Sequence, residues 1–452
     1  MAPPNHNSRR SELVSLDQLK FFDHRVRKHS AAQIIKIGKS LDQFGCITPI
    51  VINEDSYVIC GEARVLAAIE IGWKTIPAIS VSHLSPAEIR AYRLADNRLA
   101  EDAEWDPVQL KAEFHEIETL GIDLEFTGFE IPEIDLTLGV SASSAADDEI
   151  EQHADDGPIV SRVGDLFEIG PHRILCGDAL LGKNYARLLG RKIAAMSITD
   201  PPYNVRIKGH VSGSGRHGEF AQASGEMSER EFAAFLATFL RHVHQVMKPG
   251  AVFMGCIDWR SSHRFVDQIE TAGFDFINIC VWTKSNPGMG SLYRSQHEFV
   301  IVARVPGGKP INNVQLGKFG RNRSNVWAYP GASSFGSQAR NDLSDHPTPK
   351  PVALVMDAIL DVTRRGDLVL DPFGGGGTTL IAAHKTGRVA RLIELDQGFV
   401  DLTIRRAEKV LGLTAVCART GRTFEELSTI RASARKVRQR ERGTPRKRGG
   451  TS

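Results

Sequence analysis

The chain has 452 residues, of which 41% are hydrophobic and 24% are charged, and its formal net charge is +2. This composition is typical of a globular protein, and the length favours two or three domains. Because acids and bases nearly balance, the overall charge does not indicate nucleic-acid binding. Any evidence for such binding must come from local motifs.

The cysteines and the apolar runs restrict the class of protein further. Six cysteines occur without a CxxC pair or a metal-like spacing, which indicates reduced, structural thiols and no metal site. The chain start lacks an apolar signal core, and no apolar run reaches about 18 residues. We therefore expect a cytoplasmic protein with no membrane partner.

The first part of the chain predicts a small α+β domain over residues 10–100. The runs "PIVIN" (49–53) and "SYVICG" (56–61) predict two paired strands, and "ARVLAAIEIGW" (63–73) predicts a helix that opens beside a charged turn. Residues 101–138, which include "EWDPVQLKAEFHEIETLGID", predict a helical bridge. Residues 139–160 are small and acidic without aromatics, which is typical of a flexible linker.

The third region, residues 161–430, alternates strand and helix patterns. "AAMSIT" (194–199) predicts a buried strand, and residues 228–247 predict a helix with a capping box of Ser228 and Glu231 that ends at Pro249 and Gly250. Strand-like runs follow at 251–257, 275–282, 298–305 and 368–371, with helices between them. This alternation predicts an α/β fold with a mostly parallel sheet covered on both faces.

The last segment, residues 431–452, has nine Arg or Lys residues and one acid, Glu441. We expect a basic disordered tail. It either improves solubility or acts as a nonspecific phosphate-binding arm.

A glycine-rich turn indicates a cofactor. "DPFGGGGTT", from Asp371 to Thr379, lies between a strand and a helix, and its four glycines let the backbone approach a ligand. No Lys-Ser or Lys-Thr follows, which excludes the triphosphate loop, and "DPF" is unexpected in a dinucleotide fold. Glu394 ends the next strand where a ribose diol needs an acceptor. Asp396 is the competing candidate, or it caps the following helix. A cofactor that has a ribose but needs no phosphate clamp fits this pattern, and S-adenosylmethionine is such a cofactor.

Three motifs in one order carry a family resemblance. "DPPY" (200–203), "DPFGGGGTT" and "HPTPKP" (346–351) together resemble the amino-methyltransferases that modify adenine or cytosine in DNA. Because "DPPY" precedes the glycine loop, the chain resembles the circularly permuted, beta-class enzymes, typified by the cell-cycle and type II adenine methyltransferases. The resemblance covers about residues 163–416. It implies a Rossmann-like fold dependent on S-adenosylmethionine, with duplex DNA as the partner.

The resemblance gives "DPPY" a chemical role. Asp200 and the backbone carbonyl of Pro201 accept the two hydrogens of an exocyclic base amine, which frees the nitrogen lone pair to attack the methyl group. Pro201 and Pro202 fix φ, so these acceptors are aimed in advance. The base must first be flipped out of the duplex, and Tyr203 provides the ring on which it stacks. Asp rather than Ser at the head of the motif favours adenine over cytosine.

The resemblance also implies the cofactor-binding residues. Asp371 is a cofactor-binding residue at the head of the loop. The loop residues Phe373, Gly374 and Gly376 line the methionine and ribose side, and Glu394 takes the ribose hydroxyls. Asp178 approaches the adenine or its ribose. His346, Thr348 and Lys350 close over the methionine moiety. The stretch "VRIKGHVSGSGRHGEF" (205–220) is either a mobile DNA-contacting lid or a surface loop.

A second resemblance lies in residues 41–85, which include "GEAR" at 61–64, and in the later "DNR" at 96–98. These are similar to the N-terminal domain of ParB-type partition proteins. The resemblance implies nucleotide at the arginine-bearing turn, although Ala63 stands where an additional arginine is usual and no helix-turn-helix obviously follows. A DNA-docking or protein-docking module and a structural appendage are the alternatives.

Other functions stay open at this stage. A nucleic-acid-binding regulator with a residual methyltransferase site is one, and RNA or a protein amide as the methyl acceptor is another. The recognition sequence and a cognate restriction enzyme cannot be read from one chain. The oligomeric state is open, with a homodimer as one option.

Overall fold

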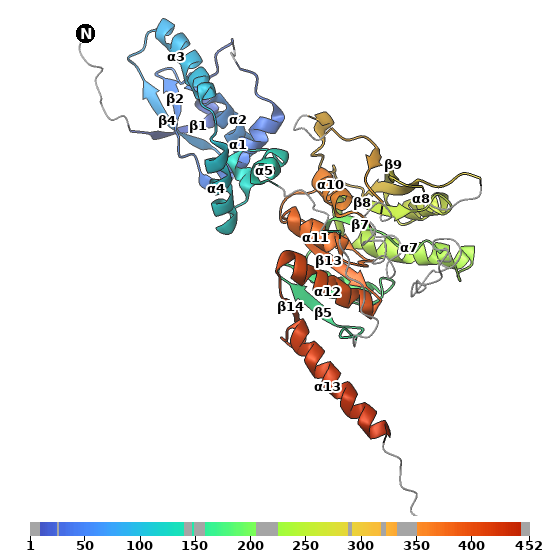
Figure 1. The fold of residues 1–452 in the computed structure, drawn as a ribbon. Coiled ribbons are helices and arrows are strands. Elements are labelled where there is room, and N and C mark those ends of the chain that lie inside the picture. The colour runs from blue at the N-terminus through green and yellow to red at the C-terminus, as the bar shows by residue number, and fades with distance from the viewer. Residues whose placement is uncertain are drawn as a thin grey trace, which may run out of the picture. The chain divides into compact units, whose positions relative to one another are not determined.

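The computed structural model describes residues 10–24, 27–139, 147–148, 159–204, 225–287, 292–317, 322–331 and 350–443, without the side chains of 316 and 434–443. The chain divides into two compact units, Met1–Gly139 and Val140–Ser452. Figure 1 shows the helices and strands of both. No helix in the described ranges is long and apolar enough to cross a membrane.

The first unit contains a four-stranded sheet with helices against it. The strand order is β1 (Glu12–Ser15), β4 (Thr75–Val81), β2 (Ile50–Asn53), β3 (Val58–Cys60). The helices are α1 (Ala31–Phe44), α2 (Glu62–Glu70) and α3 (Pro86–Arg98). The predicted strand pair is confirmed, because β2 and β3 are antiparallel neighbours, and the predicted helix after it is α2. The predicted small α+β fold is therefore confirmed.

The predicted helical bridge packs within this first unit. It forms α4 (Pro107–Thr119), η3 (Leu124–Thr127) and α5 (Ile131–Leu138) around an apolar cluster of Phe114, Leu124, Ile134 and Leu138. Two lysines of α1 reach it, since Lys39 pairs with Glu125 and Lys36 with Glu130, each at 2.6 Å. The segment thus has its own small core and is joined to α1.

The second unit is built on one sheet with ten described strands. Their order across the sheet is β11 (Val326–Ala328), β9 (Asp275–Thr283), β10 (His297–Arg304), β8 (Met247–Ile257), β7 (Ala194–Thr199), β12 (Leu368–Asp371), β13 (Val389–Glu394), β6 (His172–Cys176), β5 (Leu166–Ile169) and β14 (Ala415–Cys417). The five strands from β8 to β6 are parallel. On either side the pairs β8–β10, β10–β9, β6–β5 and β5–β14 are antiparallel. The sheet is thus mixed, with a parallel centre.

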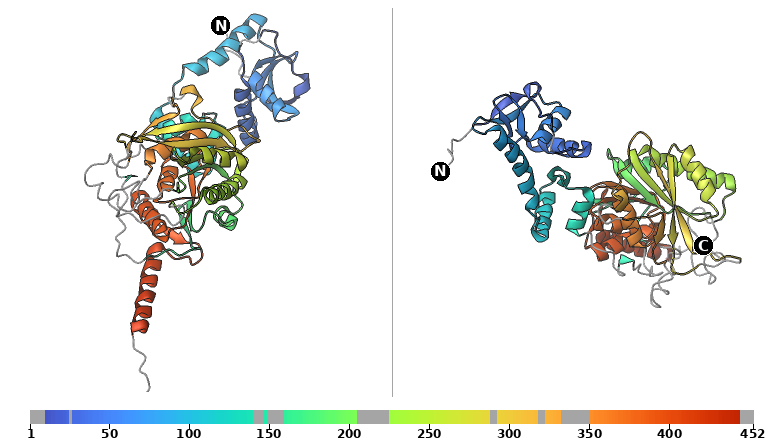
Figure 2. Two further views of the ribbon diagram at one scale, coloured as in Figure 1. Left: turned by 90° about the vertical axis from the view of Figure 1, so that its right-hand side faces the viewer. Right: turned by 90° about the horizontal axis from the view of Figure 1, so that it is seen from above.

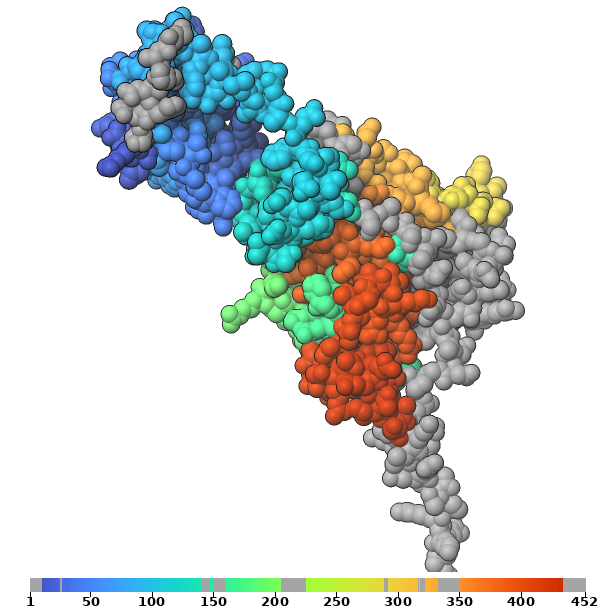
Figure 3. Space-filling model, turned by 60° about the vertical axis from the view of Figure 1, so that its left-hand side comes forward, coloured from blue at the N-terminus to red at the C-terminus, as the bar shows by residue number. Residues whose placement is uncertain are grey.

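Helices cover both faces of this sheet (Figures 1 and 2). The helices α6 (Gly182–Leu189), α7 (Glu229–Gln245) and α8 (Ser262–Thr271) share one apolar core, and α10 (Val352–Val362), α11 (Thr378–Lys385) and α12 (Gln397–Leu411) share the other. Figure 3 shows the outer surface of α11 and α12 in orange and red. The predicted Rossmann-like α/β fold is therefore confirmed.

Helix α7 ends earlier than the sequence predicts. It stops at Gln245, and Pro249 and Gly250 lie inside β8. Gly250 has φ +79°, and a Cβ there would come within 2.6 Å of the Lys309 carbonyl oxygen. The expectation that this Pro-Gly pair ends the helix is wrong, because the pair serves a close backbone approach next to the sheet.

The basic tail is helical further than expected. Helix α13 runs from Phe424 to Gly443, past the predicted domain end at residue 430. Phe424 and Leu427 are buried in its first turns, and Arg431 pairs with Asp165. Arg, Lys, Gln and Ala are good helix formers, so a helix that is anchored at one end extends through this basic sequence.

Two residues of the predicted acidic linker contact the second unit's core helices. Asp147 is buried and pairs with Lys385 of α11, and its carbonyl accepts from Arg406 of α12. Asp148 Oδ1 accepts from the backbone N–H of Val352 at 2.7 Å. Because Pro351 occupies the N-cap of α10 and has no acceptor side chain, Asp148 caps this helix from a distant part of the chain.

This cap predicts a stability effect. We expect Asp148→Ala to lower the free energy of unfolding by about 1 kcal/mol, since it leaves the Val352 N–H without its acceptor. Denaturant unfolding of the full chain measures this. Asp148→Asn keeps an oxygen acceptor and should stay close to the unchanged protein; an equal loss in both variants would mean that the charge, not the cap, is what matters.

Two hydrogen-bonded histidines, the buried His172 and the half-buried His384, join β6, β13 and α11. His172 Nδ1 accepts from the Ala390 N–H at 3.0 Å, so its proton is on Nε2, which donates to His384 Nδ1 at 3.0 Å. Burial lowers the pKa of His172 from 6.5 to about 3, and it also lowers the pKa of His384. Both rings are therefore neutral in the folded state at neutral pH.

This pair predicts a loss of stability in acid. Its contribution is complete above the unfolded pKa of 6.5 and declines as the pH falls toward 3, because the unfolded chain binds a proton that the folded chain excludes. Between pH 7 and pH 5 His172 should cost about 2 kcal/mol of unfolding free energy. Denaturant unfolding at both pH values should show this difference reduced in His172→Gln; an unchanged difference would contradict the assignment.

Candidate active site

Four predicted acids lie at the carboxyl ends of four neighbouring parallel strands. Asp200 follows β7, Asp371 ends β12, Glu394 ends β13 and Asp178 lies just after β6. From β7 the chain goes on to β8, and from β12 it goes on to β13 on the other side. The gap between β7 and β12 is thus a topological switch point, where α/β sheets bind ligands.

Asp200 is held by a lysine and a tyrosine. Lys350 Nζ donates to Asp200 Oδ2 at 2.5 Å, and the Tyr203 hydroxyl donates to Asp200 Oδ1 at 2.5 Å. The side chain of Asp200 is 25% exposed, compared with 7% for Lys350. Asp200 is therefore the more open end of this pair and can accept a further hydrogen from a ligand.

Lys350 and Glu298 form a second, deeper ion pair. Lys350 Nζ lies 3.0 Å from Glu298 Oε2, and Lys284 pairs with Glu298 Oε1. Burial alone would lower the pKa of Lys350, but the Asp200 and Glu298 carboxylates raise it well above its usual value. The pKa of Glu298, which burial would raise, is lowered by Lys350 and Lys284. Both groups are therefore charged at neutral pH.

The Tyr203 hydroxyl is fixed between two acids. It lies 2.5 Å from Asp200 Oδ1 and 3.2 Å from Glu298 Oε2. Burial raises the pKa of Tyr203 far above its usual value, so the phenol stays neutral and keeps its proton to donate. The ring orientation is thereby set by the two carboxylates.

The rest of "DPPY" leads into the segment outside the described residues. Pro201 is buried and Pro202 is half-buried. The Asn204 side chain donates to Met227 O at 2.8 Å and accepts from Gly225 N at 3.1 Å, which joins the two described ends on either side of 205–224. The predicted lid at 205–220 lies in that undescribed segment.

The glycine loop is held by Asp371 from below. Asp371 accepts from the Thr199 hydroxyl at 2.8 Å, the Thr379 hydroxyl at 2.6 Å and the Phe373 N–H at 3.1 Å. Burial raises the pKa of Asp371 to about 7. The structure thus gives Asp371 the task of shaping the loop, while Phe373 packs its ring 5.0 Å from that of Phe239 on α7.

Three loop glycines have defined contacts. Gly374 N–H donates to the Ile393 carbonyl at 2.9 Å, and the Gly376 carbonyl accepts from Arg406 at 2.7 Å. Gly377 has φ +79°, and a Cβ there would meet Thr403 at 2.7 Å, so only glycine fits. Backbone therefore forms the floor on which a ligand would lie.

Glu394, not Asp396, faces this loop. Glu394 Oε2 accepts from the Gly375 N–H at 2.8 Å and Oε1 from the Asp396 N–H at 2.8 Å. Asp396 instead caps α12 through the N–H groups of Gly398 and Phe399, which confirms the capping interpretation. Burial raises the pKa of Glu394 to about 7. A carboxylate with four lone pairs can still accept from two hydroxyls beside these amides.

Asp178 lies next to Glu394. The Gly177 N–H donates to the Glu394 carbonyl at 2.8 Å, and Asp178 Oδ1 accepts from the Leu180 N–H at 2.8 Å. A glycine floor with two neighbouring carboxylates offers acceptors for hydroxyl and amino groups and no phosphate clamp. These residues fit the nucleoside part of S-adenosylmethionine.

The "HPTPKP" motif is described only in part. His346 and Thr348 lie outside the described residues, and the Lys350 ammonium binds Asp200 and Glu298, although the resemblance implied a place over the methionine moiety. The sequence motifs did not include Glu298 and Lys284. The signal for Glu298 was an acid inside the apolar run "EFVIVARV", which was interpreted only as a strand.

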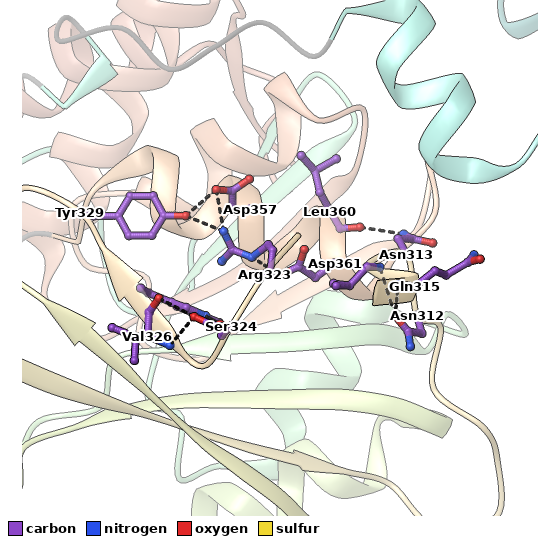
Figure 4. A network of polar contacts seen from close by, with 12 residues as sticks. Asn312, Asn313, Gln315, Arg323, Ser324, Val326, Tyr329, Asp357, Leu360 and Asp361 are labelled. Atoms are coloured by element: carbon purple, nitrogen blue, oxygen red, sulfur yellow. Dashed lines mark hydrogen bonds and ion pairs between the residues drawn. The ribbon is translucent and has the colours of Figure 1, made fainter. Parts of the chain in front are cut away.

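A network around Arg323 fixes the position of α10, the helix that follows Lys350 (Figure 4). Arg323 donates to Asp357 Oδ2 at 3.0 Å and to the Tyr329 hydroxyl at 2.9 Å, and its Nε lies 2.8 Å from Asp361 Oδ2. Tyr329 also binds Asp357. These contacts bind segment 322–331 to α10. No sequence motif predicted them.

Three family models match the chain. The DNA methylase model N6_N4_Mtase covers residues 194–405, the ParB N-terminal domain model covers 3–98, and the ParB-methyltransferase HTH domain model covers 109–163. The last match corrects the expectation that no helix-turn-helix follows the first domain. The matched segment includes α4, η3 and α5 and continues into the acidic stretch, whose composition had indicated a linker.

Several known proteins are similar to the second half of the chain. The type II methyltransferase M2.DpnII of Streptococcus pneumoniae is 27% identical over 47% of this chain and 82% of that protein. M.ScaI of Streptomyces caespitosus is 23% identical over 51% of this chain and 80% of that protein. A putative DNA modification methylase from Thermus thermophilus, solved with S-adenosyl-L-methionine, is 24% identical over 53% and 95% of the two chains, with a TM-score of 0.38.

The family matches agree with the geometry of the site. The DNA methylase match spans Asp200, the glycine loop and Glu394, which the fold brings to one edge of the sheet. It confirms the expected class of S-adenosylmethionine-dependent methyltransferase. The chain therefore carries a DNA methyltransferase domain of the N6/N4 amino-methylating type, preceded by a ParB N-terminal domain and a ParB-methyltransferase HTH domain.

Proposed function

We propose that this chain transfers a methyl group from S-adenosylmethionine to the exocyclic amine of adenine in duplex DNA, after the base has been flipped out. The observation that carries the proposal is the partly exposed Asp200 carboxylate at the switch point, fixed by Tyr203 and Lys350. Asp at the head of the motif favours adenine. Cytosine N4 is the alternative. Since β7 with "DPPY" precedes β12 with the glycine loop, the chain order supports the permuted, beta-class subtype.

The residues of the chain prepare the amine. Asp200 keeps lone pairs beside its bonds to Lys350 and Tyr203, and one of these accepts an amine hydrogen. The Pro201 carbonyl accepts the other, and the rigid Pro-Pro backbone keeps both acceptors in place. Two acceptors draw the nitrogen toward tetrahedral geometry and free its lone pair. When bound, S-adenosylmethionine supplies an electrophilic methyl group on a sulfonium.

Other residues bind the two substrates. The glycine loop and Phe373 would hold the cofactor, with Glu394 on the ribose hydroxyls and Asp178 nearby. Tyr203, whose hydroxyl is tied to Asp200 and Glu298, presents its half-buried ring for stacking of the flipped base. We propose that the N-terminal unit docks DNA or protein, with nucleotide at the Gly61–Arg64 turn as a further hypothesis; there Arg64 donates to the Thr48 carbonyl at 2.6 Å.

A third prediction concerns Asp200 and the base. Purified protein incubated with unmethylated duplex DNA and labelled S-adenosylmethionine should place label in methyladenosine after digestion of the DNA. Asp200→Ala should lower kcat about 100- to 1000-fold, because one preorganised acceptor is lost. Asp267→Ala, an exposed acid of α8, is the matched control and should keep full activity.

Other outcomes of this assay are equally informative. Label in methylcytosine would leave the mechanism standing and overturn the base preference. Cofactor binding with no label on duplex DNA would point to an RNA or protein acceptor, or to a regulator with a residual site.

A fourth prediction concerns Glu394. We expect Glu394→Gln to raise the dissociation constant for S-adenosylmethionine about 10- to 100-fold, the cost of losing a charged hydrogen-bond acceptor. Because the pKa of Glu394 is raised to about 7 and the ionised form is the acceptor, affinity of the unchanged protein should fall about tenfold from pH 8 to pH 6. Glu394→Gln should lack this pH dependence.

Isothermal titration calorimetry measures both effects. Asp396→Asn is the control, since asparagine still caps α12 and the affinity should be unchanged. A large loss of affinity in Asp396→Asn, with none in Glu394→Gln, would reassign the ribose contact to Asp396.

A further inference from the structure

A buried carboxylate behind Asp200 has no role in the mechanism described so far. Glu298 lies on β10, and its side chain is 9% exposed. Its Oε2 lies 3.0 Å from Lys350 Nζ and 3.2 Å from the Tyr203 hydroxyl oxygen. Lys284, which directly follows β9, pairs with Oε1. Glu298 therefore touches both groups that hold Asp200.

We propose that Glu298, with Lys284 behind it, is a positioning residue that sets how strongly Lys350 holds Asp200, and through this how readily Asp200 accepts the amine hydrogen. The proposal rests on the proposed function, in which Asp200 is that acceptor.

Lys350 shares its N–H donors among three neighbouring groups. An ammonium group has three N–H donors, and Lys350 directs them toward Asp200 Oδ2 at 2.5 Å, Glu298 Oε2 at 3.0 Å and the Tyr203 hydroxyl at 3.3 Å. The two carboxylates therefore compete for one positive charge. A weaker claim by Glu298 leaves more of that charge on Asp200, and a stronger claim leaves less.

Lys284 adjusts this competition from the far side. It neutralises part of the Glu298 charge through Oε1, the oxygen that does not face Lys350. The two carboxylates and two ammonium groups sum to zero charge. In this balanced state Lys350 neutralises Asp200 only in part, which suits an acceptor that must compete for an amine hydrogen.

A purely structural role does not explain the arrangement. Burying several charges is costly, and an apolar cluster of similar volume is often as stable, so buried ion pairs are weak evidence for a stabilising role. Here the charges converge on the acid of "DPPY", and Asp200 is their most exposed member. Other titratable groups near Asp200 are Cys256 on β8 and Asp371 on β12.

The test uses two substitutions with opposite expected effects. In Glu298→Gln, Lys350 acts on Asp200 alone, so its hydrogen bond to the Asp200 carboxylate should become stronger. In Lys284→Met, Glu298 draws Lys350 more strongly, so the hydrogen bond from Lys350 to Asp200 should become weaker. Adding Lys284→Met to Glu298→Gln should change nothing further, because Lys284 acts only through Glu298.

Two readouts report the strength of this hydrogen bond in the full chain. The first is the position of the infrared carboxylate band of Asp200, in protein carrying carboxyl-labelled aspartate, assigned by subtracting the spectrum of Asp200→Asn. The second is kcat for methyl transfer at saturating DNA and cofactor. Glu298→Gln should also lower kcat about tenfold with KM unchanged, while cofactor affinity stays the same. Lys248→Met, which removes the distant Lys248–Asp367 pair, is the matched control.

The outcomes separate this inference from the proposed function. Opposite shifts of the Asp200 band support the coupling even if no DNA is methylated, in which case the proposed function alone fails. Methylation of DNA with an unmoved band in both variants would overturn the inference. If Glu298→Gln does not fold, the shift in Lys284→Met decides, and no shift there would overturn the inference.

Discussion

The ion pair between Lys350 and Asp200 is the contact on which the candidate site depends. The two residues are 150 positions apart, and one lies next to a strand while the other lies next to a helix. Asp200 directly follows β7, whereas Lys350 lies two residues before the start of α10, which the Arg323 network holds in place. The position of the Lys350 ammonium group therefore depends on how α10 is held by Arg323.

Three acids at adjacent strand ends have three different environments. Asp200 is paired with an ammonium group, Asp371 is bound by two hydroxyls, and Glu394 is bound by backbone amides. Burial raises the pKa of Asp371 and Glu394 to about 7. The Asp200 side chain, by contrast, keeps a quarter of its surface exposed to a ligand. Three neighbouring strand ends thus place their acids in three different environments, which suit three different tasks in the proposed function.

The linker between the two units takes part in the same architecture. Arg406 of α12 bonds the Gly376 carbonyl of the cofactor loop and the Asp147 carbonyl of the linker. Asp148 caps α10, which begins two residues after Lys350. The few described residues of this acidic segment therefore contact the supports of both the glycine loop and the lysine. Composition predicted a flexible connection here, because short acidic stretches without aromatics cannot form a core of their own.

The sequence by itself determined the class of fold, the position of "DPPY" at a strand end, and Glu394 as an acceptor near the glycine loop, because these depend on local periodicity and on motif order. It also indicated that Asp396 could cap a helix. It did not determine the partners of Asp200. Glu298 and Lys284 reach that acid only because the antiparallel strands β9 and β10 join the parallel centre of the sheet at β8. An acid inside an apolar run signals a buried charge but not its partners, because pairing between distant strands leaves no local signal, so only the tertiary structure decided which charges surround Asp200.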